Sequence, residues 1–193
     1  MKVTSRQTYR LVRWMLEHPE FKQLRASKET GVAFSRVNKV VNWLVDVGYA
    51  ARIANGYRLV SPVALLGLFR LNRSMGKLRT STFEVQAERK ELDGLIQKTD
   101  SVYCLTSALS RYDTYFRDPS IHVYAGKELA DELLKFPRGL ARLDLYRDDL
   151  GAPEDVIHSG SGDYTSEMRT IIDVICSDRS YAAERLIKKK WSK

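Results

Sequence analysis

The segment from Gly31 to Val60, GVAFSRVNKVVNWLVDVGYAARIANGYRLV, combines a helical pattern with a hairpin pattern. Its apolar residues recur at helical spacing up to Gly48, which predicts a helix with one buried side. The predicted buried residues are Val37, Val40, Val41, Leu44 and Val47. Two short segments typical of strands follow, and Asn55-Gly56 between them is a strong signal for a type I′ turn. We therefore expect a helix capped by Ser35, followed by a β-hairpin with its tip at Asn55-Gly56.

Two further helices are expected before this segment. Residues 5–18 repeat apolar side chains at helical spacing, with Ser5 as a cap and Pro19 barring continuation. Residues 26–30 form a brief helix that ends at Gly31, a residue type common after the last turn of a helix. The expected order is therefore helix, helix, helix, hairpin.

This order resembles the winged helix-turn-helix family over roughly residues 5–61. The segment that carries the resemblance is residues 26–60, ASKETGVAFSRVNKVVNWLVDVGYAARIANGYRLV. It contains a helix, a turn, a second helix and the pattern Leu-x-x-x-Gly-Tyr before the hairpin. The resemblance implies that residues 35–47 form a recognition helix and that the hairpin is a wing. It also implies a transcriptional regulator that binds double-stranded DNA in a sequence-specific way.

Charge is distributed unevenly along the 193 residues, whose net charge is +8. Residues 1–79 contain 15 Lys or Arg against 4 Asp or Glu, whereas residues 80–193 contain 17 against 20. This asymmetry indicates a basic module that meets a polyanion and a near-neutral module with another role. There is no apolar run of about 20 residues and no apolar signal core near the start. We therefore expect a cytoplasmic protein with no membrane segment.

The buried stripe decides which side of the predicted recognition helix faces DNA. The major groove, about 12 Å wide, admits one α-helix, in which Arg pairs with guanine and Asn with adenine. The base-edge or phosphate candidates on this helix are Ser35, Arg36, Asn38, Lys39 and Asn42. The backbone candidates are Arg52, Tyr57 and Arg58 in the hairpin, and Arg6, Arg10, Arg13 and Lys28 before it. A solvated surface charge is the alternative for each single Lys or Arg, and Trp43 is expected in a core or an interface.

The remaining pattern predicts a second domain. A helix is expected over residues 62–72, and Gly76 interrupts the basic stretch RSMGKLRTST that follows. We expect a DNA-binding domain over residues 1–73, a linker over 74–80 and a second domain over 81–193, where strands and helices alternate. The predicted fold class is α+β, with an N-terminal winged helix-turn-helix and a C-terminal mixed α/β domain.

Catalytic patterns are weak in the second half. The histidines, which share no metal-ligand spacing, are His18, His122 and His158. Cys104 and Cys176 lie far apart, which argues against a zinc framework or a disulfide scaffold. We expect no catalytic residue, no metal and no cofactor, and hence no enzyme. The alternative left open is a DNA-tethered, metal-dependent nuclease or nucleotidyltransferase in which Asp148-Asp149 holds magnesium.

A second resemblance covers about residues 102–176. VYCLTSALSRYDTYFRDPSIHVYAG, followed by RLDLYRDDLG, DVIHSG and YTSEMRTIIDVIC, is similar to the C-terminal half of AbiEi-type antitoxins of type IV toxin–antitoxin pairs. The resemblance implies autorepression through the winged helix and neutralisation of a nucleotidyltransferase-like toxin, with Asp173 in a structural role. Because one small module reads few base pairs, a homodimer is also expected, and the second domain would supply the dimer contact, an effector pocket or the toxin-binding face.

Overall fold

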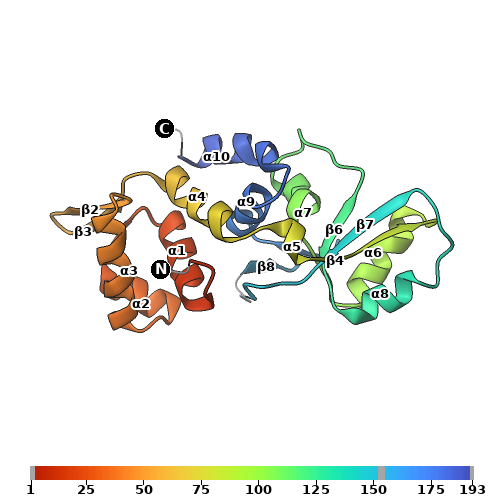
Figure 1. Ribbon diagram of the computed structural model, residues 1–193, viewed down its shortest axis with the longest axis horizontal. Coiled ribbons are helices and arrows are strands. Elements are labelled where there is room, and N and C mark those ends of the chain that lie inside the picture. Colours follow the sequence, from red (N-terminus) through yellow and green to blue (C-terminus); the bar gives the residue numbers. More distant parts are fainter. Residues whose placement is uncertain (1–2, 152–154, 192–193) are drawn as a thin grey trace. The chain divides into compact units, whose positions relative to one another are not determined.

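The computed structural model describes residues 3–151 and 155–191 (Figure 1). The chain divides into two compact units, an N-terminal unit that ends at Arg73 and a C-terminal unit that begins at Ser74. The fold is mixed α+β, with a three-stranded sheet and a six-stranded mixed sheet. Within the described ranges, no helix has both the length and the apolar character needed to cross a membrane.

The N-terminal unit contains four helices and one small sheet among its described residues. In order, these elements are α1 (Arg6–Glu17), β1 (Glu20–Phe21), α2 (Gln23–Thr30), α3 (Phe34–Asp46), β2 (Ala50–Ile53), β3 (Gly56–Leu59) and α4 (Pro62–Asn72). The predicted helices and hairpin are thus confirmed, although α2 begins three residues earlier than expected. Strand β1 was not predicted, and it pairs with β3 to give the antiparallel order β1-β3-β2.

Helix α3 differs from the prediction at both ends. It begins at Phe34 after the extended residue Ala33, so Ser35 lies inside the first turn and is not the cap. At the other end, Val47 follows the last helical residue and is 46% exposed. Its assignment to the buried stripe was therefore wrong, because the chain already turns there toward Gly48, whose φ is +77°. The other four predicted stripe residues are buried as expected.

The tip of the hairpin is shifted by one residue from the prediction. Ile53 pairs with Gly56, so the two loop residues are Ala54 and Asn55, and Gly56 is the first residue of β3. Only Gly56 has a positive φ here, +144°, and the turn is therefore not type I′. The cause is β1: a Cβ at Gly56 would lie 2.3 Å from the carbonyl oxygen of Phe21, so glycine is required where the two strands meet.

The C-terminal unit is built around the six-stranded sheet. Its described elements are α5 (Met75–Leu78), β4 (Arg79–Val85), α6 (Arg89–Lys98), β5 (Val102–Tyr103), α7 (Leu105–Tyr112), β6 (Ile121–Tyr124), α8 (Lys127–Leu133), β7 (Ala141–Tyr146), β8 (Val156–Ile157), β9 (Asp163–Thr165), α9 (Glu167–Ile175), the 3-10 helix η2 (Ser180–Ala183) and α10 (Glu184–Trp191). The strand order is β4-β7-β6-β5-β9-β8, with β6/β7 and β5/β9 parallel. The segment expected to be a linker, residues 74–80, instead contains α5 and the start of β4.

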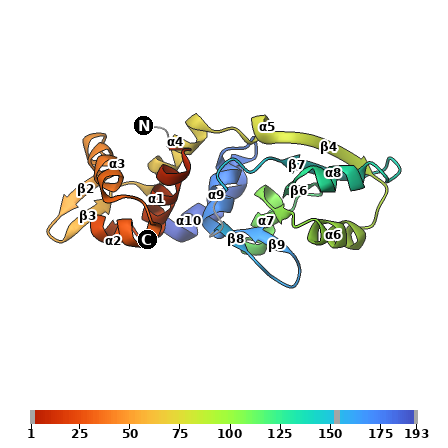
Figure 2. The same cartoon turned by 90° about the horizontal axis from the view of Figure 1, so that it is seen from below.

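The two faces of this sheet differ in polarity. Figure 2 shows α6 and α8 on one side of β6 and β7, and α9 on the other. The α6/α8 side is an apolar core to which the strands contribute Ile121, Val123, Leu143 and Leu145. Alternate residues of the same strands point to the other side, and these are His122, Tyr124, Asp144 and Tyr146, all buried. Burial of these polar groups requires the hydrogen-bonded networks described below.

Candidate nucleic-acid interface

The outer side of α3 carries the predicted contact residues. With the apolar stripe of α3 buried, the side chains of Ser35, Arg36, Asn38 and Lys39 are exposed, and Asn42 is partly exposed. Helical geometry alone produces this separation, because residues three and four apart share one face. The side chains do not all point the same way, however, and they divide into two groups, one on the side of α1 and one on the side of α2.

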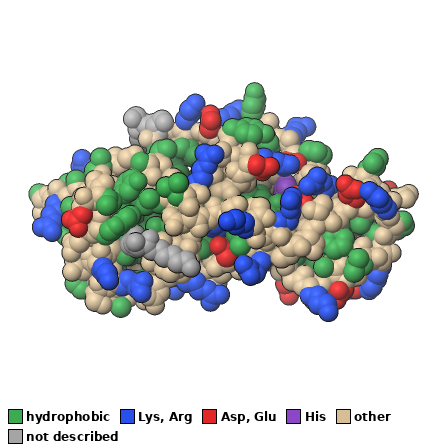
Figure 3. Space-filling view, viewed as in Figure 1, with side chains coloured by type: hydrophobic (Ala, Val, Ile, Leu, Met, Phe, Trp, Pro, Cys, Tyr) green, Lys and Arg blue, Asp and Glu red, His purple; other side chains and the backbone are tan. Residues whose placement is uncertain are grey.

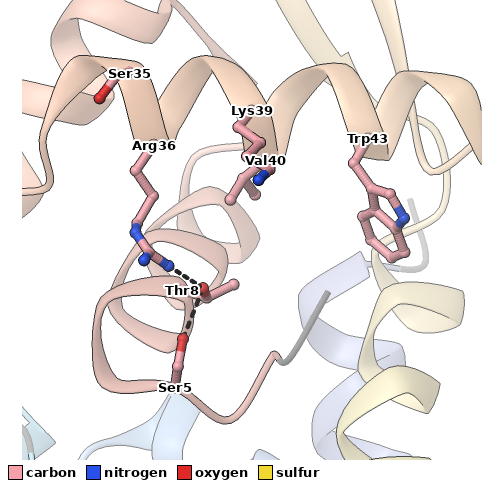
Figure 4. Close-up of a pocket in the computed structure, with 7 residues that line it drawn as sticks. All are labelled: Ser5, Thr8, Ser35, Arg36, Lys39, Val40 and Trp43. Atoms are coloured by element: carbon pink, nitrogen blue, oxygen red, sulfur yellow. Dashed lines mark hydrogen bonds between the residues drawn. The ribbon is translucent and has the colours of Figure 1, made fainter.

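The group on the side of α1 lines a groove of about 730 Å³. Its lining residues are Ser5, Thr8, Ser35, Arg36, Lys39, Val40 and Trp43 (Figure 4). Arg36 reaches across the groove, where its Nη1 donates to the Thr8 hydroxyl at 3.5 Å, and the Ser5 hydroxyl donates to the same oxygen at 2.9 Å. Arg36 therefore contacts a neutral hydroxyl, and among the described residues it has no ion pair with a carboxylate.

The group on the side of α2 is a cluster of three amides: Gln23, Asn38 and Asn42. Nε2 of Gln23 donates to Oδ1 of Asn38 at 3.2 Å, and Nδ2 of Asn42 donates to the same oxygen at 3.2 Å. Gln23 is the first residue of α2, and the sequence did not indicate it as a contact residue. The sequence pattern left residues 21–24 undefined, so nothing in it placed Gln23 beside α3.

The hairpin carries two exposed cations, Arg52 and Arg58, and the second is paired with an acid. Arg52 is exposed on β2. On β3, both Nε and Nη2 of Arg58 lie 2.8 Å from Oε1 of Glu20, the residue opposite it on β1. Tyr57 is partly buried and stacks on Phe21, with ring centroids 5.9 Å apart. The third strand, which the sequence did not reveal, thus supplies a carboxylate to Arg58 and an aromatic ring to Tyr57.

The cations outside α3 and the hairpin are also unequal. Arg6, Arg10 and Lys28 are exposed, whereas the Arg13 side chain is only 12% exposed and lies 3.4 Å from the Glu17 carboxylate. The structure therefore does not place Arg13 with the other candidates. On the face of the molecule shown in Figure 3, Lys and Arg side chains project around α2, α3 and the hairpin, with hydrophobic side chains between them.

In the C-terminal unit, Arg169 is the centre of one buried polar network. It is 1% exposed; its Nε lies 2.9 Å from Asp173, and its Nη2 lies 2.8 Å from Asp148 and donates to the Tyr124 hydroxyl at 2.9 Å. Burial alone would raise the pKa of Asp148, but the Arg169 charge and the Gly151 amide outweigh it and lower that pKa. The guanidinium thus lies beside the acidic pair considered for magnesium. In the part of the chain that the structure describes, no group of three or more His, Cys, Asp or Glu is arranged to hold a metal ion.

His122 is the centre of the second network. Its Nε2 lies 3.1 Å from both Asp118 and Arg179, and its Nδ1 lies 3.3 Å from the Tyr146 hydroxyl. Burial lowers the pKa of His122 to about 4, against the opposing effect of the Asp144 charge. The histidine is therefore neutral near pH 7, with both ring nitrogens engaged. His122 thus joins β6 to β7 and to the segments that carry Asp118 and Arg179.

Comparisons with known proteins identify no family for this chain. No model of a known family, no curated protein and no solved structure matches the chain. The two resemblances in the sequence therefore remain hypotheses, and the surface around α3 carries the functional argument.

Proposed function

We propose that the N-terminal unit is a winged helix-turn-helix module that binds double-stranded DNA, and that the chain is a sequence-specific transcriptional regulator. The observation that carries the proposal is the outer side of α3, where Arg36, Asn38 and Lys39 are exposed opposite a fully apolar buried side. The order α1-β1-α2-α3-β2-β3 and the sheet order β1-β3-β2 support it, because they put a hairpin directly after this helix.

The physical basis of binding differs between the two sides of α3. Arg36 and Lys39 supply charges that neutralise phosphates and release their counterions, which favours DNA of any sequence. The amide cluster and the Arg36 guanidinium supply hydrogen bonds to base edges in the major groove, which favour particular sequences. The hairpin, with Arg52 and Arg58, is suited to backbone contacts that orient the module without reading bases.

The role of the C-terminal unit is a second, separate part of the proposal. It rests on the sequence resemblance to AbiEi-type antitoxins, which implies an autorepressor that neutralises a nucleotidyltransferase-like toxin. A homodimer on a two-fold operator fits the small number of base pairs that one module reads. Coexpression with such a toxin tests this part: growth should be restored by the full chain and not by an unrelated DNA-binding protein.

The DNA-binding proposal is tested by selecting duplexes from a random pool with the full-length chain and measuring their affinity by fluorescence polarisation. We expect one enriched motif, bound about a thousandfold or more tighter than random duplex. The same duplexes are then incubated with magnesium and nucleotides. Absence of an enriched motif would contradict the proposal, and magnesium-dependent cleavage or nucleotide transfer would favour the alternative enzyme.

A further inference from the structure

The hydrogen bonds of the amide cluster run in one direction, and this direction determines what the cluster can offer to DNA. Oδ1 of Asn38 accepts from both Gln23 and Asn42, so the two lone pairs of this carbonyl oxygen are used. Its Nδ2, which has two hydrogens, makes no hydrogen bond among the described residues. Asn38 is exposed at this position, and its amide therefore presents donors to an incoming ligand.

A donor-only amide differs from an ordinary asparagine in its base preference. Asparagine usually reads adenine by accepting from N6 and donating to N7 at once, which needs both its oxygen and its nitrogen. With the oxygen of Asn38 engaged inside the protein, only donation remains. Guanine presents two adjacent acceptors, N7 and O6, in the major groove and is the base that matches two donors.

We propose that Gln23 is a specificity-determining residue, which holds the Asn38 amide so that α3 favours guanine at one position of the site. This inference rests on the proposed DNA-binding function and deepens it. Gln23 acts through Asn38 and needs no base contact of its own. It comes from α2, so the base preference of the helix depends on a neighbouring element, and replacing α3 alone would not transfer it.

The exchange Gln23→Glu tests the inference because a carboxylate accepts hydrogen bonds and cannot donate them. The Asn38 amide then turns its nitrogen toward the new carboxylate, the Asn42 amide turns with it so that its oxygen accepts from Asn38, and the Asn38 oxygen faces the DNA. We expect the preferred base at that position to change from guanine to one with an exposed donor, cytosine or adenine, with a relative change of about tenfold or more. An acidic residue in the first turn of α2 is favourable for the helix, so folding is retained.

Two further variants separate this mechanism from a general effect of charge. Gln7→Glu adds the same negative charge on the exposed side of α1 and should weaken binding to all duplexes without changing the preferred base. In an Asn38→Ala background, Gln23→Glu should no longer change the base preference, because the amide through which Gln23 acts is absent.

Base preference is read by sequencing the duplexes that each variant selects from the random pool. If the unmodified chain selects a motif and Gln23→Glu selects the same motif, the role of Gln23 is refuted while the DNA-binding function stands. If the unmodified chain selects no motif, both proposals fail together. The inference is also refuted if Gln23→Glu changes the preferred base and does so equally in the Asn38→Ala background.

Discussion

At the scale of single residues, Arg36 and Arg58 have the same charge in different surroundings. Arg36 contacts the neutral Thr8 hydroxyl beside the groove, whereas Arg58 lies against the Glu20 carboxylate. An arginine already paired with an acid gains less by approaching a phosphate, because the pair must be weakened first. The two residues should therefore contribute unequally to DNA binding.

We predict that Arg36→Ala weakens binding to the selected duplex by about 1–3 kcal/mol and relaxes the preference at one base pair. Arg58→Ala should weaken binding to selected and random duplexes alike, and by less. Fluorescence polarisation with both duplexes measures the two effects. Equal losses for the two variants, or an unchanged preference with Arg36→Ala, would contradict the assignment of base reading to α3.

His122 makes the stability of the C-terminal unit depend on pH. Its pKa is about 4 in the folded protein, below the ordinary value of 6.5, because burial disfavours the charged ring. Between these two pH values the unfolded chain binds the proton more tightly than the folded protein does. The contribution of His122 to the free energy of unfolding is therefore fully present above pH 6.5 and is lost as the pH falls toward 4. At pH 5 the expected loss is about 2 kcal/mol.

Urea unfolding at about pH 7.5 and about pH 5, followed by circular dichroism, measures this loss. His122→Asn should be less stable at the higher pH, because several hydrogen bonds change, but its stability should fall less between the two pH values. A variant with the same pH dependence as the unmodified chain would show that other groups cause it.

At the scale of elements, strong apolar periodicity was sufficient to predict α1 and α3, and two strand-like segments around Asn55-Gly56 were sufficient to predict the hairpin. The helix boundaries and the hairpin tip were less accurate, since they depend on neighbours. Strand β1 has only two residues and no pattern of its own, and it exists because β3 offers a free edge to pair with. That pairing places Phe21 against Gly56 and shifts the tip by one residue from the position that Asn55-Gly56 suggests.

Two glycine exchanges test this account with opposite expected signs. Gly56→Ala should destabilise the N-terminal unit by about 1–3 kcal/mol, because its Cβ would meet the Phe21 carbonyl. Gly67→Ala on the exposed side of α4 has nothing within 4 Å of the new Cβ and should stabilise by about 0.5–1 kcal/mol. Thermal unfolding gives both values. A neutral Gly56→Ala would mean that β1 and β3 are not in close contact.

At the scale of the whole molecule, the excess positive charge lies in the first 79 residues, whose 15 Lys or Arg face only 4 Asp or Glu. The near-neutral remainder instead has charges in internal networks, such as those around Arg169 and His122. Charge that is not neutralised inside the protein remains available for a polyanion. The distribution thus supports the proposal that the N-terminal unit binds DNA.

Binding to DNA should consequently depend steeply on salt. If about five cations each neutralise one phosphate, the logarithm of affinity falls against the logarithm of salt concentration with a slope of about −4 to −5. Lys39→Gln should reduce the magnitude of this slope by about 1. Polarisation titrations between low and high salt measure both. Affinity independent of salt would exclude phosphate neutralisation and would favour a module used for protein contacts.

Local pattern was enough for the mixed helix and strand content, the buried stripe of α3 and its exposed cations, because helical spacing and turn residues act over a few neighbours. Contacts between residues distant in the chain decided the position of the hairpin tip and the partners of the candidate DNA-binding side chains. The Gln23–Asn38 hydrogen bond, the Glu20–Arg58 pair and the Thr8–Arg36 contact join residues 15, 38 and 28 positions apart. No periodicity encodes such pairs, since packing of the elements alone brings them within hydrogen-bond distance.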